Sequence, residues 1–218
     1  LEATQVASAF VQQSECWGVV TTVGYLRGAR SRLAAFEHHA VDIVLLSSGS
    51  AQMLMADAAE QGFELFDVGY GSYYRPGSLV VVEKTDAALS RRPRVGIDFH
   101  SSDHQRLTRA QFPEADYEYV EVDFTLLPRS VFLGEIDTGV WHQQASLIPL
   151  DKVGLNICPL DNPSAQALAK EISSAVLVVR SSSPVAQLLH QLDLPRLQQQ
   201  SSQAFDSLNN VQLAFRLP

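Results

Sequence analysis

Short, uninterrupted runs of apolar residues recur along this chain, and they constrain the fold more than any other feature of the sequence. Residues 43–46, 79–82 and 176–179 each place four apolar side chains in succession. Such a run is typical of a strand that is buried on both faces of a sheet. Segments with helical spacing, such as residues 30–36 and 163–172, separate these runs. The alternation predicts an α/β fold with mostly parallel sheets and flanking helices.

Two stretches of the chain repeat the same order of elements, which predicts two similar lobes. Residues 33–47 and residues 131–142 each give a helix, a turn with an aspartate, a strand and a polar loop. A cleft between two such lobes is a common place for a small molecule to bind. The predicted division is an N-terminal helix within 1–16, lobe I at 17–84, a polar crossover at 85–93, lobe II at 94–180, and C-terminal helices at 181–218 that return to lobe I.

Composition and charge exclude several classes of protein. The 218 residues include 16 basic and 24 acidic side chains, so the formal net charge is −8, and no basic cluster marks a nucleic-acid surface. A membrane span needs about 18 successive apolar residues, and no run approaches that length. Cys16 and Cys158 belong to no metal-binding pattern, so we expect two buried thiols in a reducing compartment. No cofactor motif occurs, and we predict neither a cofactor nor a metal.

Two motifs resemble the lobes of type II periplasmic binding proteins. They are Val-Asp-Ile-Val at residues 41–44 and Gly-Glu-Ile-Asp-Thr-Gly-Val at residues 134–140. In lobes of that family a helix ends in a Gly-x-x-Asp turn, and the strand that follows delivers ligand contacts. The resemblance therefore implies a two-lobed fold of this type, with a ligand cleft between the lobes.

A second set of motifs resembles the effector domain of the bacterial transcriptional regulators called YhfZ. Tyr-Leu-Arg-Gly-Ala at residues 25–29, Val-Gly-Ile-Asp at 95–98 and Ser-Asp at 102–103 carry most of this resemblance, which extends from about residue 17 to the C-terminal helices. It implies a cytoplasmic, homodimeric domain that senses a small molecule and reaches DNA only through a winged-helix domain. Nothing in this chain resembles a winged helix, and the first helix is the candidate connector to one.

The family pattern also places a strand, a loop and a helix before the Tyr-Leu-Arg-Gly-Ala strand. Here only residues 17–23 lie between the first helix and that motif, and no helix fits in this space. We therefore expect that family residues are missing around residues 20–22. The Val-rich residues 19–20 and residues 23–26 are themselves predicted to be strands.

Polar loops follow the first buried strand of lobe I and the first strand of lobe II, and we predict that they face each other across the cleft. Both loops lead into helices, whose first backbone N–H groups favour anions or polar carbonyls. Capping alone explains the serines of these loops equally well. The carboxylate of Asp103 would compete with an anionic ligand for the same N–H groups. The predicted ligand-binding residues are Arg27, Ser47, Ser48, Ser50, Tyr70, Ser72, Tyr73, His100, Ser101, Ser102, Asp103, Trp141 and His142.

Several of these residues have an alternative structural interpretation. The Tyr-rich loop at residues 70–76 suits a cleft wall, because tyrosine rings stack on ligands and hydrogen-bond to them, but it also suits a surface turn. Trp141 is an equally good core residue. His100 and His104 are four residues apart, yet the pair lacks a third metal ligand. The doublet at residues 38–39 ends a helix, where it complements the helix dipole.

Three functions from different classes fit these observations. The first is a domain that senses an unidentified polar small molecule for a transcriptional regulator. The second is a solute-binding protein of a transporter, which has the same fold. The third is an enzyme that uses His100, Asp103 and His142 as acid and base. Because no nucleophile elbow or other catalytic motif occurs, we assign no catalytic residue and favour the first function.

Overall fold

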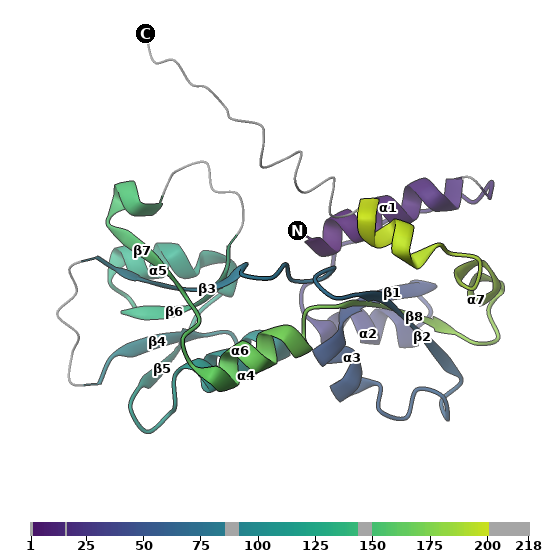
Figure 1. Ribbon diagram of the computed structural model, residues 1–218. Helices are drawn as coiled ribbons and strands as arrows, with labels where there is room; N and C mark the ends of the chain where they lie inside the picture. Colours follow the sequence, from purple (N-terminus) through teal and green to yellow (C-terminus); the bar gives the residue numbers. More distant parts are fainter. Residues whose placement is uncertain (1, 16, 86–91, 144–149, 201–218) are drawn as a thin grey trace, which may run out of the picture.

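The computed structural model describes residues 2–15, 17–85, 92–143 and 150–200, which form two lobes that each enclose one sheet (Figure 1). The first sheet has the order β1–β8–β2, and the second has the order β5–β4–β6–β3–β7. The strands of the first sheet are β1 (Ile43–Ser47), β8 (Ala175–Arg180) and β2 (Phe63–Gly69). Those of the second are β5 (Glu118–Glu121), β4 (Arg94–Ile97), β6 (Thr138–His142), β3 (Leu79–Lys84) and β7 (Leu155–Pro159).

Helices cover both faces of each sheet. Around the first sheet lie α1 (Glu2–Glu15), α2 (Ala29–Glu37), α3 (Ser48–Leu54), α7 (Pro184–Leu189) and a helical segment that begins at residue 194 (Figure 1). Around the second lie α4 (Ser102–Gln111), α5 (Leu127–Leu133) and α6 (Pro163–Glu171), with short 3-10 turns at Phe124–Leu126 and Leu150–Val153. The two-lobed α/β fold expected from the sequence is confirmed.

The apolar run in β8 forms the centre of the first lobe. Its side chains alternate between the two faces of the sheet, as a strand requires. Ala175, Leu177 and Val179 belong to the core shared with α1 and α7, whereas Val176 and Val178 belong to the core shared with α2 and α3. All five are buried, so the prediction of a strand covered on both faces is correct here.

The first sheet is antiparallel and the second is mixed, whereas the sequence predicted mostly parallel sheets. Strand β8 runs antiparallel to β1 and β2, and β3 runs antiparallel to β6 and β7. Strand β4 is parallel to both of its neighbours. A continuous apolar run shows that a strand is buried on both faces, but it carries no information on the direction of its partners.

Two strands also lie in the opposite sheets from those expected. Strand β3 was predicted in lobe I but pairs in the second sheet, and β8 was predicted in lobe II but pairs in the first. The chain therefore crosses between the sheets at residues 70–78 and again at residues 172–174. The lobe boundaries predicted at residues 84 and 180 do not follow the sheets. Of the crossover predicted at 85–93, residues 86–91 lie outside the described part of the chain.

Residues 19–26, predicted as two strands, have no regular secondary structure. Val20 is 94% exposed and Tyr25 is 73% exposed. Since neither sheet pairs with this segment, its β-branched residues gain no cross-strand contacts. The segment leads from α1 directly into α2, without the strand, loop and helix of the family pattern.

Local signals at helix ends behave as the sequence predicts. Gly134 ends α5 in the left-handed conformation with φ of 75°, and Asn162 caps α6 by accepting the backbone N–H of Ser164 at 3.0 Å. Helix α3 begins at Ser48, directly after its cap residue Ser47, and ends at Leu54. None of the helices that the structure describes is both long and apolar enough to cross a bilayer. Cys158 is a free, half-buried thiol, and Cys16 lies outside the described residues.

Candidate functional site

The two polar loops predicted to face each other are in direct contact. Ser47 caps α3, accepting the N–H of Ser50 at 3.0 Å, and Ser101 caps α4, accepting the N–H of His104 at 3.3 Å. The hydroxyl of Ser50 lies 3.1 Å from that of Ser102. The beginnings of α3 and α4 therefore form a hydrogen-bonded seam between the lobes.

Asp103 fills the space at the beginning of α3. Its side chain is 4% exposed and accepts hydrogen bonds from Ser50 at 3.2 Å and from the hydroxyl of Tyr74 at 3.4 Å. A Cβ added to Gly49 would lie 3.2 Å from the Asp103 carboxylate and 2.4 Å from the Ile172 side chain. The carboxylate of Asp103 therefore lies at the beginning of α3, where it would compete with an anionic ligand, as the sequence predicts.

Burial raises the pKa of Asp103, although hydrogen bonds from Ser47, Ser50 and Tyr74 oppose the shift. A folded carboxyl with a raised pKa binds more protons than the unfolded chain does, so its contribution to stability falls as pH rises above its ordinary value. We expect the melting temperature of Asp103→Asn, relative to the original protein, to increase between pH 4 and pH 7. Thermal unfolding across this range tests the expectation. A relative decrease would mean that the ionised carboxylate stabilises the seam.

A small cavity beside the seam has a volume of about 20 Å³, which leaves room for about one water molecule. Its walls include Tyr74, Asp103 and the buried side chains of Trp141 and His142. The rings of Tyr74 and His142 pack edge to face with their centroids 5.2 Å apart. These side chains fill the space beside the seam, so a metabolite does not fit in this cavity.

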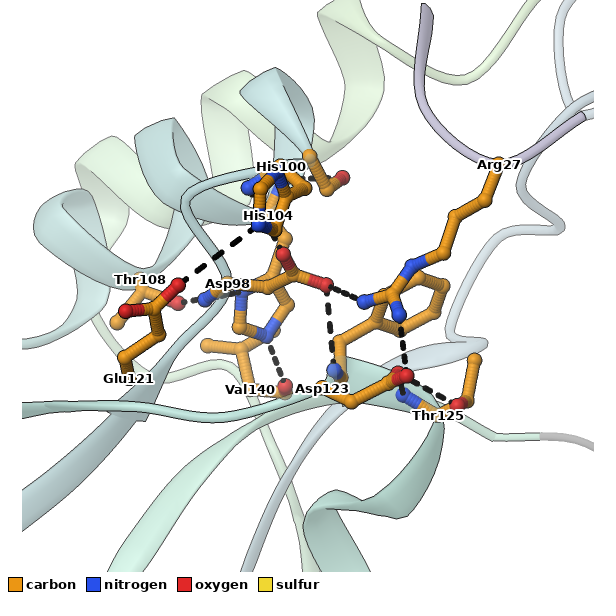
Figure 2. A network of polar contacts seen from close by, with 11 residues as sticks. Arg27, Asp98, His100, His104, Thr108, Glu121, Asp123, Thr125 and Val140 are labelled. Carbon is orange, nitrogen blue, oxygen red and sulfur yellow. Dashed lines mark hydrogen bonds and ion pairs between the residues drawn. The ribbon is translucent and has the colours of Figure 1, made fainter. Parts of the chain in front are cut away.

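Arg27 links the segment before α2 to the second lobe (Figure 2). Its guanidinium forms ion pairs with Asp98, at the end of β4, and with Asp123. The side chain of Asp98 is only 1% exposed, and it also accepts the backbone N–H groups of His100 at 2.9 Å and Phe124 at 3.3 Å. One arginine therefore bridges two carboxylates of the other lobe, and we call this group the Arg27 bridge.

His104 lies beside the Arg27 bridge and connects three elements of the second lobe (Figure 2). Its Nδ1 accepts the backbone N–H of Asp98 at 3.1 Å, and its Nε2 donates to the carbonyl of Val140 at 2.7 Å. Burial lowers its pKa, so the ring is neutral. Both nitrogens bind backbone groups, which leaves none for a ligand. His100 has a different environment: it is exposed, with Nε2 3.8 Å from Glu121.

A larger pocket opens on the other side of the Arg27 bridge, between α2, α3 and α4. Its volume is about 390 Å³, within the range of pockets that hold small organic molecules. Within the described residues, no three His, Cys, Asp or Glu side chains converge on a metal position there or elsewhere. We call it the arginine pocket, and its walls are Arg27, Ala29, Arg30, Ser31, Met53, Phe99, His100, Ser102, Gln105 and Arg106.

Comparison with known protein families identifies this chain. The sequence profile described as the YhfZ C-terminal domain matches residues 2–205. The chain belongs to the YhfZ C-terminal domain family. The resemblance first seen in short motifs therefore extends over nearly the whole chain. No curated protein sequence matches the chain.

Solved structures confirm the fold of this YhfZ domain. YhfZ from Shigella flexneri is 20% identical, with 95% of this chain and 84% of that chain aligned and a TM-score of 0.64. The periplasmic aliphatic sulphonate binding protein SsuA from Escherichia coli is 14% identical, with coverages of 95% and 71% and a TM-score of 0.60. A variant of the OxyR2 regulatory domain from Vibrio vulnificus is 15% identical, with coverages of 91% and 89% and a TM-score of 0.57.

The predicted ligand-binding residues of this YhfZ domain are divided among several places. Arg27, His100 and Ser102 line the arginine pocket. Ser101, Asp103, Trp141 and His142 line the small cavity beside the seam. Ser47 and Ser50 belong to the seam itself.

The remaining predicted residues have other partners. Ser48 donates to the carbonyl of Glu171 at 2.6 Å, and Ser72 joins Gly69 to Ala175 through its hydroxyl. Tyr73 accepts a hydrogen bond from Arg32 at 2.9 Å. Tyr70 is 53% exposed and lies outside both cavities. The sequence predictions missed several residues of the arginine pocket, which are Ala29, Arg30, Ser31, Met53, Phe99, Gln105 and Arg106.

Proposed function

We propose that this YhfZ domain senses a small molecule for a transcriptional regulator, and that the ligand binds in the arginine pocket. The observation that carries the proposal is the composition of the pocket walls. Ala29, Ser31 and Met53 come from elements around the first sheet, whereas Ser102 and Arg106 come from α4 of the second lobe. A ligand that contacts both lobes has a different affinity for each arrangement of the lobes, which is what a sensor requires.

The rest of the regulator follows by analogy with its relatives. One structural neighbour is described as a regulatory domain, which supports the assignment to regulation in the cytoplasm. DNA contact would come from a part of the protein outside this chain, since the domain carries a net charge of −8. We propose a homodimer, because regulators commonly bind two half-sites of their operator. The proposal is one of binding without turnover.

The second candidate is a solute-binding protein of a transporter. The observation that favours it is the fold shared with SsuA, which is described as a periplasmic aliphatic sulphonate binding protein. Ligand binding between the lobes is common to both candidates. They differ in what ligand binding controls: operator affinity in the first case and delivery to a membrane transporter in the second.

A thermal-shift screen of this domain against a metabolite library tests the proposal. A ligand present at 100 times its dissociation constant should add about 2.7 kcal/mol of stability, which corresponds to a melting temperature several degrees higher. We expect at least one such ligand, and we expect Ser31→Trp to abolish its effect by filling the arginine pocket. Gln187→Trp, on the exposed face of α7, is the matched control and should keep the full effect.

Two results would contradict the proposal. The first is a library without any stabilising compound. The second is a stabilising compound whose effect is the same in Ser31→Trp and in Gln187→Trp, because that compound would bind elsewhere. For a confirmed ligand, a change in operator affinity of the full-length regulator separates the first candidate function from the second.

A further inference from the structure

We infer that the ligand of the arginine pocket is a small organic anion, whose phosphate or carboxylate group binds between Arg30 at the beginning of α2 and Arg106 of α4. This inference rests on the proposed function and adds the chemical class of the ligand. The pocket adjoins the seam, since Ser102 belongs to both, but Asp103, which supplies a negative charge at the seam, is not part of its walls.

The charge of the pocket wall is the first reason for this inference. Arg27, Arg30 and Arg106 all line the pocket, and no acidic side chain from the described part of the chain does. In a domain with a net charge of −8, three guanidinium groups on one concave surface are a local exception. Concave surfaces with one sign of charge concentrate ligands of the opposite sign.

The three arginines are not equivalent. Arg27 is already neutralised by Asp98 and Asp123. Among the described residues, Arg106 forms an ion pair with Glu171 at 2.8 Å and also interacts electrostatically with Asp103, and its side chain is 35% exposed. Arg30 is exposed and forms no ion pair or hydrogen bond with the residues that the structure describes. Arg30 is therefore the charge that is available to a ligand, and Arg106 is the second.

The backbone at the beginning of α2 adds further donors. Gly28 occupies the cap position and offers no side-chain oxygen, and no acidic residue lies in the first turn. Ala29, Arg30 and Ser31 of this turn all line the pocket. Uncapped N–H groups beside two guanidinium groups favour the oxygens of a phosphate or carboxylate.

Other walls of the pocket fit the organic part of such a ligand. Met53 is 44% exposed and Phe99 is 46% exposed, although both are large apolar residues. Ser102 and Gln105 add uncharged hydrogen-bonding groups from α4. The combination suits a molecule with one anionic end and a less polar body, rather than a free inorganic ion.

An NMR titration of this domain with inorganic phosphate and with citrate, at constant ionic strength, tests the inference. We expect at least one probe to shift the backbone amide signals of Ala29, Arg30 and Ser31 saturably at millimolar concentration. Arg30→Gln should weaken this binding roughly tenfold, since a charged hydrogen bond is lost. Arg129→Gln, an exposed arginine on α5, is the control and should leave binding unchanged. Binding of phosphate alone indicates a phosphorylated ligand, and binding of citrate alone indicates a carboxylate.

The inference is overturned if neither anion gives saturable shifts at α2, or if Arg30→Gln binds as well as the original protein. The amide spectrum of Arg30→Gln shows directly whether the variant is folded. A neutral metabolite that stabilises the domain in the library screen, and is unaffected by Arg30→Gln, would overturn the anionic ligand class while leaving the proposed function intact.

Discussion

His104→Ala is expected to lower the free energy of unfolding by about 4 kcal/mol, because it removes a buried ring and leaves two backbone groups without partners. The ring is 7% exposed and joins the N–H of Asp98 to the carbonyl of Val140. An alanine side chain can neither accept the N–H of Asp98 nor donate to the carbonyl of Val140. Urea unfolding followed by tryptophan fluorescence measures the change. His38→Ala, at an exposed helix end, is the control and should change stability by less than about 0.5 kcal/mol.

The same histidine predicts how stability depends on pH. Burial lowers its pKa, so the unfolded chain takes up a proton more readily than the folded domain does as pH falls below the ordinary value of 6.5. The original protein should therefore lose part of its advantage over His104→Ala between pH 6.5 and pH 5. If the difference in unfolding free energy were below about 1 kcal/mol at pH 7, or constant with pH, the role given to His104 would be wrong.

Local sequence signals were sufficient to predict most elements of this fold. Capping by Ser101, the glycine stop at Gly134 and the Asn-Pro start at residues 162–163 each depend on a few neighbouring residues. Because these signals act within one helical turn, they do not depend on how the rest of the chain folds. The helices that carry these signals, α4, α5 and α6, are all present in the structure.

The pairing of strands could not be predicted in the same way. Strands β3 and β8 both have continuous apolar runs, and each pairs with strands that are distant in the sequence. A run that is apolar on both faces fits the middle of either sheet equally well. The segment at residues 19–26 shows the converse. It has strand-like composition but no partner in either sheet, and composition alone does not reveal this.

Only part of the candidate site could be predicted, because it also depends on contacts between distant segments of the chain. The serine loops at α3 and α4 were expected to face each other, and they do so through Ser50 and Ser102. Arg30 and Arg106 were missed because exposed arginines on helices are ordinary, and only the arrangement of the lobes brings them to one pocket. One signal was available: Arg27, Arg30 and Arg32 place three arginines within six residues, beside a glycine.

Arg27→Ala is expected to lower the free energy of unfolding by about 2 kcal/mol, because the buried carboxylate of Asp98 loses its charged partner. Two backbone N–H groups remain on Asp98, which limits the loss. The side chain of Arg27 is 46% exposed, so its pair with the more exposed Asp123 adds little. Urea unfolding at pH 7 measures the effect. Arg30→Ala, three residues away and without an ion pair among the described residues, should cost less than about 0.5 kcal/mol.

The Arg27 bridge should also hold the two lobes together. A second variant and a second measurement distinguish this role from the contribution of Arg27 to overall stability. Arg27→Lys keeps the charge, but a single ammonium group cannot form the two-sided contact of a guanidinium, so we expect only partial recovery. Hydrogen exchange at the beginning of α2 should be faster in Arg27→Ala than in Arg30→Ala, because Arg27 ties this segment to Asp98 and Asp123. Equal exchange in these two alanine variants, or full recovery by lysine, would mean that Arg27 contributes charge but no link between the lobes.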